Sequence, residues 1–193
     1  MKMSILFFQI LFLTLASITS YGQQSKDDAI NSALLAAPED KREGATVLGF
    51  DESGKTVVLR KGTNELICLA DDPSRNGFSV ACYHKDLDPF MARGRELRLE
   101  GKEFKEIFTI REKEAKEGKF SIPDKATLHI VTGDSFDSQS GTIVNEFKRW
   151  VFYLPYATAE STGLPEVPAG PGAPWLMNAG TFAAHIMITP AKN

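Results

Sequence analysis

Hydrophobic and polar positions alternate in short blocks through the first half of the chain. Apolar runs at residues 45–50 and 56–60 flank an Asp-Glu-Ser-Gly turn, a pattern that predicts a β-hairpin. A third run follows at residues 65–70 and a fourth at residues 78–83, each after a segment rich in turn-forming residues. We therefore predict that the first three strands form an antiparallel meander, with the fourth strand returning beside the third.

Three segments instead carry apolar residues three and four positions apart, which is the period of an α-helix. Residues 27–37 form the first predicted helix, with Ser25 as its cap. A second helix is predicted over residues 88–100, with Asp88 as its cap and a proline at its first position. The helical pattern resumes over residues 102–116, where one side is apolar and the other is charged.

The second half of the chain returns to strand patterns. Residues 126–132, 147–156 and 185–188 have the alternation and the β-branched or aromatic content of strands. Residues 133–141 are predicted to be a polar loop and the proline-rich residues 163–174 an extended one. The elements predict a single α+β domain: a mostly antiparallel sheet of five to seven strands, with an N-terminal helix and one or two further helices packed on it.

Residues 1–22 have the composition of a secretory signal peptide. Lys2 supplies a positive charge, residues 5–18 are mostly apolar, and small residues precede Gln23. The apolar stretch is shorter than the roughly 20 residues of a membrane-spanning helix, although an uncleaved N-terminal anchor is the alternative. Because no cysteine stands near the cleavage point, we expect residues 23–193 to be exported without a lipid anchor, to the periplasm or outside the cell.

The charge balance excludes one class of partner. The chain has 22 basic and 25 acidic residues, and loss of Lys2 with the signal peptide leaves a net charge of −4. A mildly acidic chain without a dense basic face is a poor match for nucleic acid. No later segment is apolar over the length that crosses a membrane, so we expect no transmembrane anchor after cleavage. We also expect no cofactor, since the chain has no phosphate-binding or dinucleotide-binding motif.

The two cysteines, Cys68 and Cys82, are predicted to form a disulfide. In an oxidising compartment the bridge would close a loop of about 15 residues and contribute roughly 3 kcal/mol in the chain-entropy model. A metal-binding or redox-active pair of thiols is the alternative, although the spacing is not Cys-x-x-Cys.

The histidines and nearby aspartates are the candidate catalytic residues. His84 has Asp86 close in sequence, and Asp71 lies across the predicted disulfide, so this group could orient an imidazole or bind a cation. His185 opens an apolar strand and becomes relevant if the fold brings it near His84 or the acidic loop. The more ordinary interpretation is that the aspartates cap turns and the histidines are structural. The spacing matches no zinc motif, and we expect no metal site.

Several short segments form a recognisable set: residues 59–64 (LRKGTN), 68–73 (CLADDP), 82–85 (CYHK), 174–177 (PWLM), 180–181 (GT) and 184–188 (AHIMI). Together they resemble a family of exported bacterial proteins of unknown function, over most of the chain that follows the signal peptide. The resemblance implies a bacterial envelope or secreted protein and implies no activity. It draws attention to Arg60 and Asn64, with the two cysteines, His84 and His185. These residues could form one binding site or equally one cluster with a structural role.

The sequence is compatible with two functions from different classes. The first is a non-catalytic binding or envelope-associated protein that recognises an unidentified ligand or envelope component. The second is a hydrolase-like enzyme that uses His84 or His185 with an aspartate. The fold distinguishes them, because imidazoles that lie far apart without a shared carboxylate leave the enzyme without geometric support.

Overall fold

The computed structural model describes residues 25–191. Its helices are α1 (Lys26–Leu34), α2 (Asp88–Leu99), α3 (Phe104–Lys116) and α4 (Ala159–Thr162), with single 3₁₀ turns at Glu39–Lys41 and Lys85–Leu87. Its strands are β1 (Thr46–Phe50), β2 (Thr56–Arg60), β3 (Leu66–Leu69), β4 (Phe78–His84), β5 (Ala126–Gly133), β6 (Ser135–Asp137), β7 (Thr142–Val144), β8 (Phe147–Tyr153), β9 (Trp175–Met177) and β10 (His185–Ile188).

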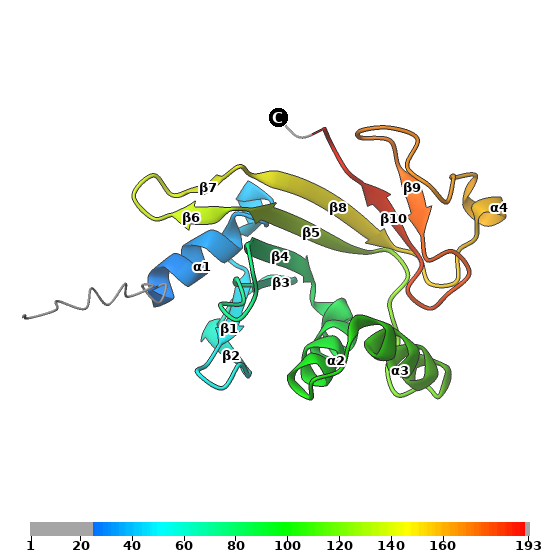
Figure 1. Ribbon diagram of the computed structural model, residues 1–193, viewed down its shortest axis with the longest axis horizontal. Helices are drawn as coiled ribbons and strands as arrows, with labels where there is room; N and C mark the ends of the chain where they lie inside the picture. Colours follow the sequence, from blue (N-terminus) through cyan, green and yellow to red (C-terminus); the bar gives the residue numbers. More distant parts are fainter. Residues whose placement is uncertain (1–24, 192–193) are drawn as a thin grey trace, which may run out of the picture.

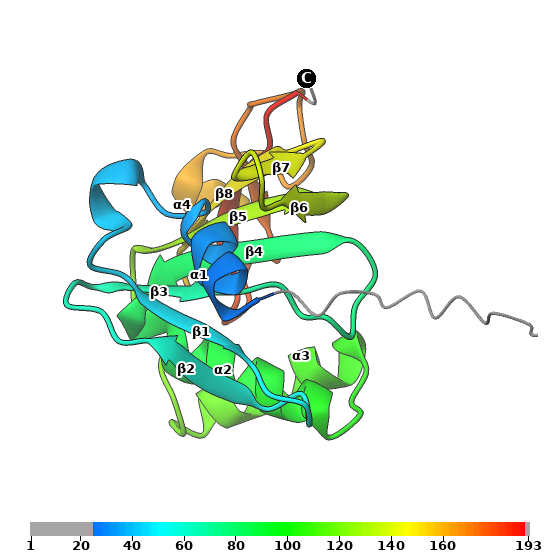
Figure 2. The same ribbon diagram turned by 90° about the vertical axis from the view of Figure 1, so that its left-hand side faces the viewer.

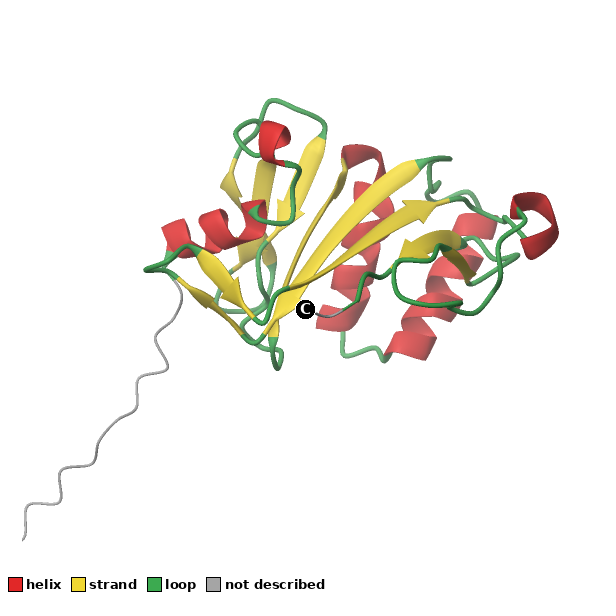
Figure 3. Ribbon diagram, turned by 90° about the horizontal axis from the view of Figure 1, so that it is seen from above, coloured by secondary structure: helices red, strands yellow, loops and turns green. Residues whose placement is uncertain are grey.

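One large sheet organises the described part of the chain. Eight strands lie in the order β2-β1-β3-β4-β5-β8-β10-β9, and β6 and β7 form a separate hairpin between β5 and β8. Every neighbouring pair in the large sheet is antiparallel except β1 and β3. Figure 2 shows the strands from β2 to β8 in this order, and Figure 3 shows the twisted strands through the middle of the molecule. The predicted α+β class with a mostly antiparallel sheet is confirmed.

The predicted antiparallel meander is wrong at its third strand. β1 and β2 form the predicted hairpin, but β3 lies on the other side of β1 and runs parallel to it. The chain therefore crosses the start of β1 between β2 and β3. Gly62 makes the crossing possible, because a Cβ atom there would fall within the backbone of Gly44, Ala45 and Thr46.

Three short strands, β6, β7 and β9, were not predicted from the sequence. Residues 133–141 contain β6 and the turn toward β7, so the prediction of a plain polar loop is wrong there. Each of these strands has only three residues, which is too few for a period of two to stand out. The main sheet consequently has eight strands within residues 25–191, one more than the upper end of the predicted range.

Alternate side chains of the central strands point to opposite faces of the sheet and build two cores. On one face α1 packs against β1 to β4, and the buried cluster includes Ala33, Val47, Cys68, Val80 and Cys82. On the other face lie α2 and α3, which run side by side below the sheet in Figure 1, and the cluster includes Tyr83, Phe90, Leu128, Val151 and Phe182.

The helix starts were predicted with mixed success. Ser25 caps α1 as expected, since its hydroxyl accepts a hydrogen bond from the backbone nitrogen of Asp28 at 3.1 Å. Asp88 is not the cap of α2 but its first residue, because the 3₁₀ turn at Lys85–Leu87 leads directly into the helix. The Asp88 carboxylate instead accepts hydrogen bonds from the Tyr83 hydroxyl at 2.8 Å and from Arg95 at 3.1 Å.

The predicted disulfide between Cys68 and Cys82 is confirmed. The two residues lie directly opposite each other on β3 and β4, with their Cα atoms 4.0 Å apart. Both are fully buried under α1. The bridge therefore joins the strand that follows the crossing at Gly62 to the centre of the sheet.

The substitution Gly62→Ala should destabilise the protein by about 3 kcal/mol or more, because the new methyl group meets backbone that cannot move aside. Urea denaturation followed by circular dichroism measures the change. Gly170→Ala is the matched control, since a Cβ at that position has no neighbour within 4 Å. A change below about 1 kcal/mol for Gly62→Ala would show that the crossing is not as tight as described.

Reduction of the disulfide should lower the free energy of unfolding by about 3 kcal/mol, since the reduced unfolded chain regains the freedom of the closed loop. The comparison is made on the same protein, unfolded and refolded with and without dithiothreitol. The double substitution Cys68→Ala with Cys82→Ala is the control and should be insensitive to the reductant. Equal stability of the oxidised and reduced proteins would contradict this prediction.

Candidate functional site

The principal pocket lies on the face of the sheet that α2 and α3 cover. It has a volume of about 380 Å³ and opens between α2, α3 and the ends of β1 and β3. Most of its wall is apolar and consists of Phe50, Leu69, Ala70, Ala81, Phe90, Met91, Phe104, Ile107, Leu128 and Ile130. A second hollow of about 340 Å³ shares Phe50, Asp72, Arg95 and Arg98 with it and adds the turn at residues 52–54. The two hollows form one groove along α2.

Four arginines, Arg75, Arg95, Arg98 and Arg111, line this otherwise apolar pocket, with Asp72 as the acidic residue among them. Arg95 is held by the fold, since it donates hydrogen bonds to the Tyr83 hydroxyl at 2.9 Å and to the Asp88 carboxylate. The groove is therefore positively charged although the whole chain is slightly acidic.

Arg98 and Arg111 have no ion-pair partner within residues 25–191. Burial lowers the pKa of Arg111 to about 10; Tyr153 opposes this shift, and the positive charge of Arg98 contributes to it. Burial also lowers the pKa of Arg98, with a further contribution from the neighbouring charge of Arg75. Since arginine stays protonated in proteins, the shift of the Arg111 pKa means that the surroundings compensate this charge only in part. Arg98 is exposed to solvent, and the charge of Asp72 opposes the lowering of its pKa.

The position of Arg111 depends on α2. Its guanidinium carbon lies 4.0 Å from the centre of the Phe90 ring, and Nη1 donates a hydrogen bond to the Phe90 carbonyl oxygen at 3.2 Å. Its Nε is buried without a hydrogen-bond partner in the described structure. A Cβ at Gly94 would lie 2.9 Å from Nη1, so the glycine gives the guanidinium its space beside the helix.

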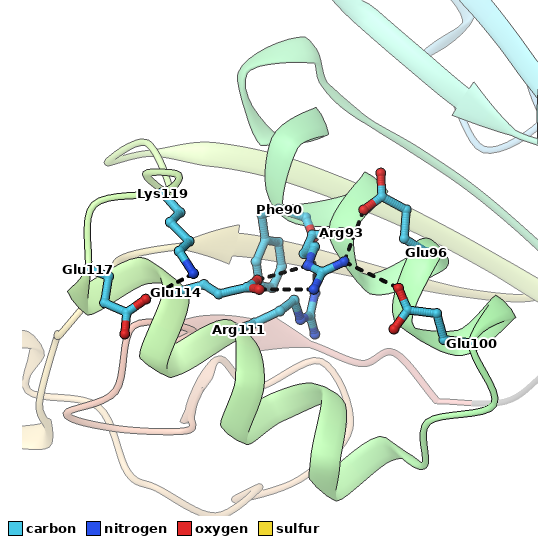
Figure 4. A network of polar contacts seen from close by, with 8 residues as sticks. All are labelled: Phe90, Arg93, Glu96, Glu100, Arg111, Glu114, Glu117 and Lys119. Carbon is cyan, nitrogen blue, oxygen red and sulfur yellow. Dashed lines mark hydrogen bonds and ion pairs between the residues drawn. The ribbon is translucent and has the colours of Figure 1, made fainter.

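A salt-bridge network fixes α2 to α3 and thereby fixes Arg111 (Figure 4). Arg93 of α2 donates two hydrogen bonds of 2.9 Å to the carboxylate of Glu114 on α3. The same guanidinium contacts Glu96 at 3.2 Å and Glu100 at 3.6 Å. The hydrogen bond from Arg93 holds the pKa of Glu114 below its ordinary value. This bidentate pair is a rigid connection, so the pocket is preformed.

Tyr153 on β8 adds a hydroxyl group to the pocket wall. Burial raises its pKa to about 12, while the nearby charge of Arg111 opposes the shift. The hydroxyl has no hydrogen-bond partner within residues 25–191. It therefore remains protonated and able to donate a hydrogen bond near Arg111.

This arrangement is suited to holding an anion. The guanidinium groups of Arg98 and Arg111 and the phenol of Tyr153 offer donors to carboxylate, phosphate or sulfonate oxygens. Within the described residues no group of three histidine, cysteine, aspartate or glutamate side chains is arranged to bind a metal ion. The pocket lining includes no histidine or cysteine that could act as a nucleophile or general base.

Arg60 and Asn64, the binding candidates from the sequence, hold the chain crossing. The Arg60 guanidinium donates to the carbonyl oxygens of Arg42 at 2.6 Å and Ala45 at 2.8 Å. The Asn64 amide donates to the Lys41 carbonyl at 2.7 Å and accepts from the backbone nitrogen of Leu66 at 2.9 Å. Neither residue lines the principal pocket. For Arg60 and Asn64, these contacts favour a structural role over a binding site.

The structure does not bring the two candidate histidines together. β4 and β10 are separated by β5 and β8, so His84 and His185 lie about 14 Å apart across three strand spacings. The pairing register also points them to opposite faces of the sheet. His84 Nδ1 accepts a hydrogen bond from the Asp86 backbone at 3.3 Å and lies 3.5 Å from the Asp86 carboxylate at an exposed turn. The enzyme hypothesis thus has no shared histidine site.

The two remaining candidates, Asp71 and His185, lie close to the pocket. The Asp71 carboxylate accepts a hydrogen bond from the Ser79 backbone at 2.8 Å, and burial raises its pKa. His185 is buried behind the pocket, with its ring centre 5.2 Å from that of Tyr153 and its Nδ1 2.7 Å from the Ala183 carbonyl oxygen. Neither residue is part of the pocket lining.

Sequence reasoning missed the pocket arginines, although one signal was available. Arg111 continues the apolar side of the third predicted helix, one turn after Ile107 and Phe108. A charged residue in an apolar stripe is placed where it must be buried, which marks it as a candidate for function. Arg98 gives no comparable signal, since basic residues are common in the last turn of a helix.

A comparison of the chain with protein-family models, curated proteins and solved structures finds no match. The resemblance to exported bacterial proteins therefore stays a prediction. The predicted signal peptide lies outside the described residues. No helix within residues 25–191 combines the length and the apolar character that crossing a membrane requires.

The stability of the protein should fall between pH 7.5 and pH 5, in part because of His185. Burial lowers the pKa of His185 below 6.5 in the folded state, although its hydrogen bond to Ala183 opposes the shift. The unfolded chain therefore takes up the proton first, and stability is lost as the pH falls below about 6.5. Urea titrations at both pH values should show a smaller fall for His185→Gln. An unchanged pH dependence in this variant would contradict the assignment. 

Proposed function

We propose that this is an exported, non-catalytic binding protein, and that the pocket between α2, α3 and the sheet holds a small organic anion. The observation that carries the proposal is the half-buried charge of Arg111, which has no ion-pair partner within residues 25–191 and lies with Arg98 in a mostly apolar pocket. Such a charge costs stability in the free protein. A bound anion recovers that cost through charge-assisted hydrogen bonds.

The surrounding fold supports a binding role. The pocket is at the lower end of the 300–1,000 Å³ range that is typical of small-molecule sites, and its few polar groups converge on one side. The Arg93–Glu114 connection fixes its helical wall, and the sheet forms its floor. A preformed site loses little conformational freedom on binding, which favours affinity.

The disulfide supports the exported location. Structural disulfides persist in oxidising compartments, and the bridge between Cys68 and Cys82 closes the only cysteine pair of the chain. The proposal accordingly places the protein in the periplasm or outside the cell, where it would recognise a free ligand or an envelope component that carries the anionic group.

The substitution Arg111→Met should separate binding from stability. It keeps the length of the side chain but removes the uncompensated charge, so the stability of the unliganded protein should stay equal or rise by up to about 2 kcal/mol. At the same time the variant should lose the stabilisation given by sodium octanoate, sodium benzoate or sodium phosphate at 10 mM and constant ionic strength. Urea denaturation with and without each salt measures both effects.

Lys105→Gln is the matched control, because it removes one exposed positive charge of α3 that does not line the pocket. The wild-type protein and this control should be stabilised alike by at least one of the three anions. A dissociation constant of 100 µM corresponds to a stabilisation of about 2.7 kcal/mol at 10 mM ligand. Equal stabilisation of Arg111→Met, or no stabilisation of the wild type by any of the anions, contradicts the proposed function.

A further inference from the structure

The arginines occupy only part of the pocket, and the remainder is built for an apolar group. The floor next to Arg111 consists of Leu128 and Ile130 of β5 with Ala81 of β4. The helical wall adds Met91 and Ile107. A small inorganic anion would leave this surface in contact with water or empty, whereas an apolar group would bury it.

Phe104 extends the apolar surface to the entrance. It is the first residue of α3 and lines the pocket, yet it is 73% exposed. A phenylalanine this exposed, at the rim of a groove, is available to cover the outer part of a bound molecule.

We infer that the ligand is an amphipathic monocarboxylate, with its carboxylate between Arg98 and Arg111 and an aliphatic or aromatic body along the floor toward Phe104. This inference rests on the proposed function. The Tyr153 hydroxyl donates a third hydrogen bond to the carboxylate.

The charges of the pocket favour one anionic group over several. Asp72 lines both the pocket and the adjoining hollow, where its carboxylate repels a second anionic group on the ligand. Arg95 is already paired with Asp88, and Arg75 is an exposed residue on the same turn as Asp72. A polyphosphate or nucleotide would need more inward-facing cations or a loop of backbone amides. A single carboxylate matches Arg98 and Arg111, which have no ion-pair partner within residues 25–191.

Isothermal titration calorimetry with a homologous series tests the inference. Acetate, butyrate, hexanoate and octanoate share a carboxylate and differ only in the apolar chain. The affinity should rise about fourfold for each methylene group that enters the pocket. Octanamide, which has the same chain without the charge, should bind at least tenfold more weakly than octanoate, and so should inorganic phosphate.

Two variants locate the apolar body. Phe104→Ser should weaken octanoate binding about tenfold and leave acetate binding unchanged, because only the longer chain reaches the entrance. Val167→Ser is the matched control, since Val167 is similarly exposed at 68% but does not line the pocket. It should bind octanoate like the wild type.

The outcomes distinguish the two proposals. If phosphate or acetate binds as tightly as octanoate, in an Arg111-dependent manner, the amphipathic ligand is refuted and the anion pocket stands. If octanamide binds as tightly as octanoate, or if none of the probes binds, both proposals fail. If Phe104→Ser and Val167→Ser weaken octanoate binding equally, the apolar body does not lie toward Phe104 and the inference is overturned.

Discussion

The close crossing of two backbone segments at Gly62 determines where the pocket can form. Because the chain passes the start of β1 without a side chain, β3 pairs with β1 in parallel. The carboxyl ends of parallel neighbours lie at the same edge of a sheet. Phe50 at the end of β1 and Leu69 at the end of β3 therefore lie at the same edge of the sheet, and the turns that follow them line the groove. An antiparallel meander would have placed these ends at the same edge but would have separated them by β2.

The two faces of the sheet are packed differently. Under α1 the core is tightly filled with small and branched side chains around the disulfide, and it carries no pocket arginine. Under α2 and α3 the packing is less complete, and Arg111 extends over the sheet. The bidentate pair between Arg93 and Glu114 holds the two helices at the spacing that leaves the cavity open. The Arg93–Glu114 pair thus holds α2 and α3 in place where the core between them and the sheet is not completely filled.

The sequence predicted the elements better than their arrangement. Residues 56–60 and 126–132 were placed correctly as strands, because period-two alternation and β-branched residues are local signals. The parallel pairing was not predictable in this way, since it depends on a backbone contact at Gly62 between segments that are distant in the pattern. The site was missed for a similar reason. His84 and His185 stood out by residue type, whereas Arg111 is informative only through the partners that it lacks in three dimensions.

Arg111 can be compared with other arginines of this protein that have oxygen partners. Arg60 is satisfied by backbone carbonyl oxygens and Arg93 by Glu114, while Arg95 has both Tyr83 and Asp88. Each of these three guanidinium groups has oxygen partners supplied by the fold. Arg111 has a ring, one carbonyl oxygen that already lies in a helix, and a neighbouring cation that repels it. A buried charge in such surroundings lowers stability, and a methionine of similar length would avoid that cost. This missing negative charge is the feature on which the proposed anion site rests.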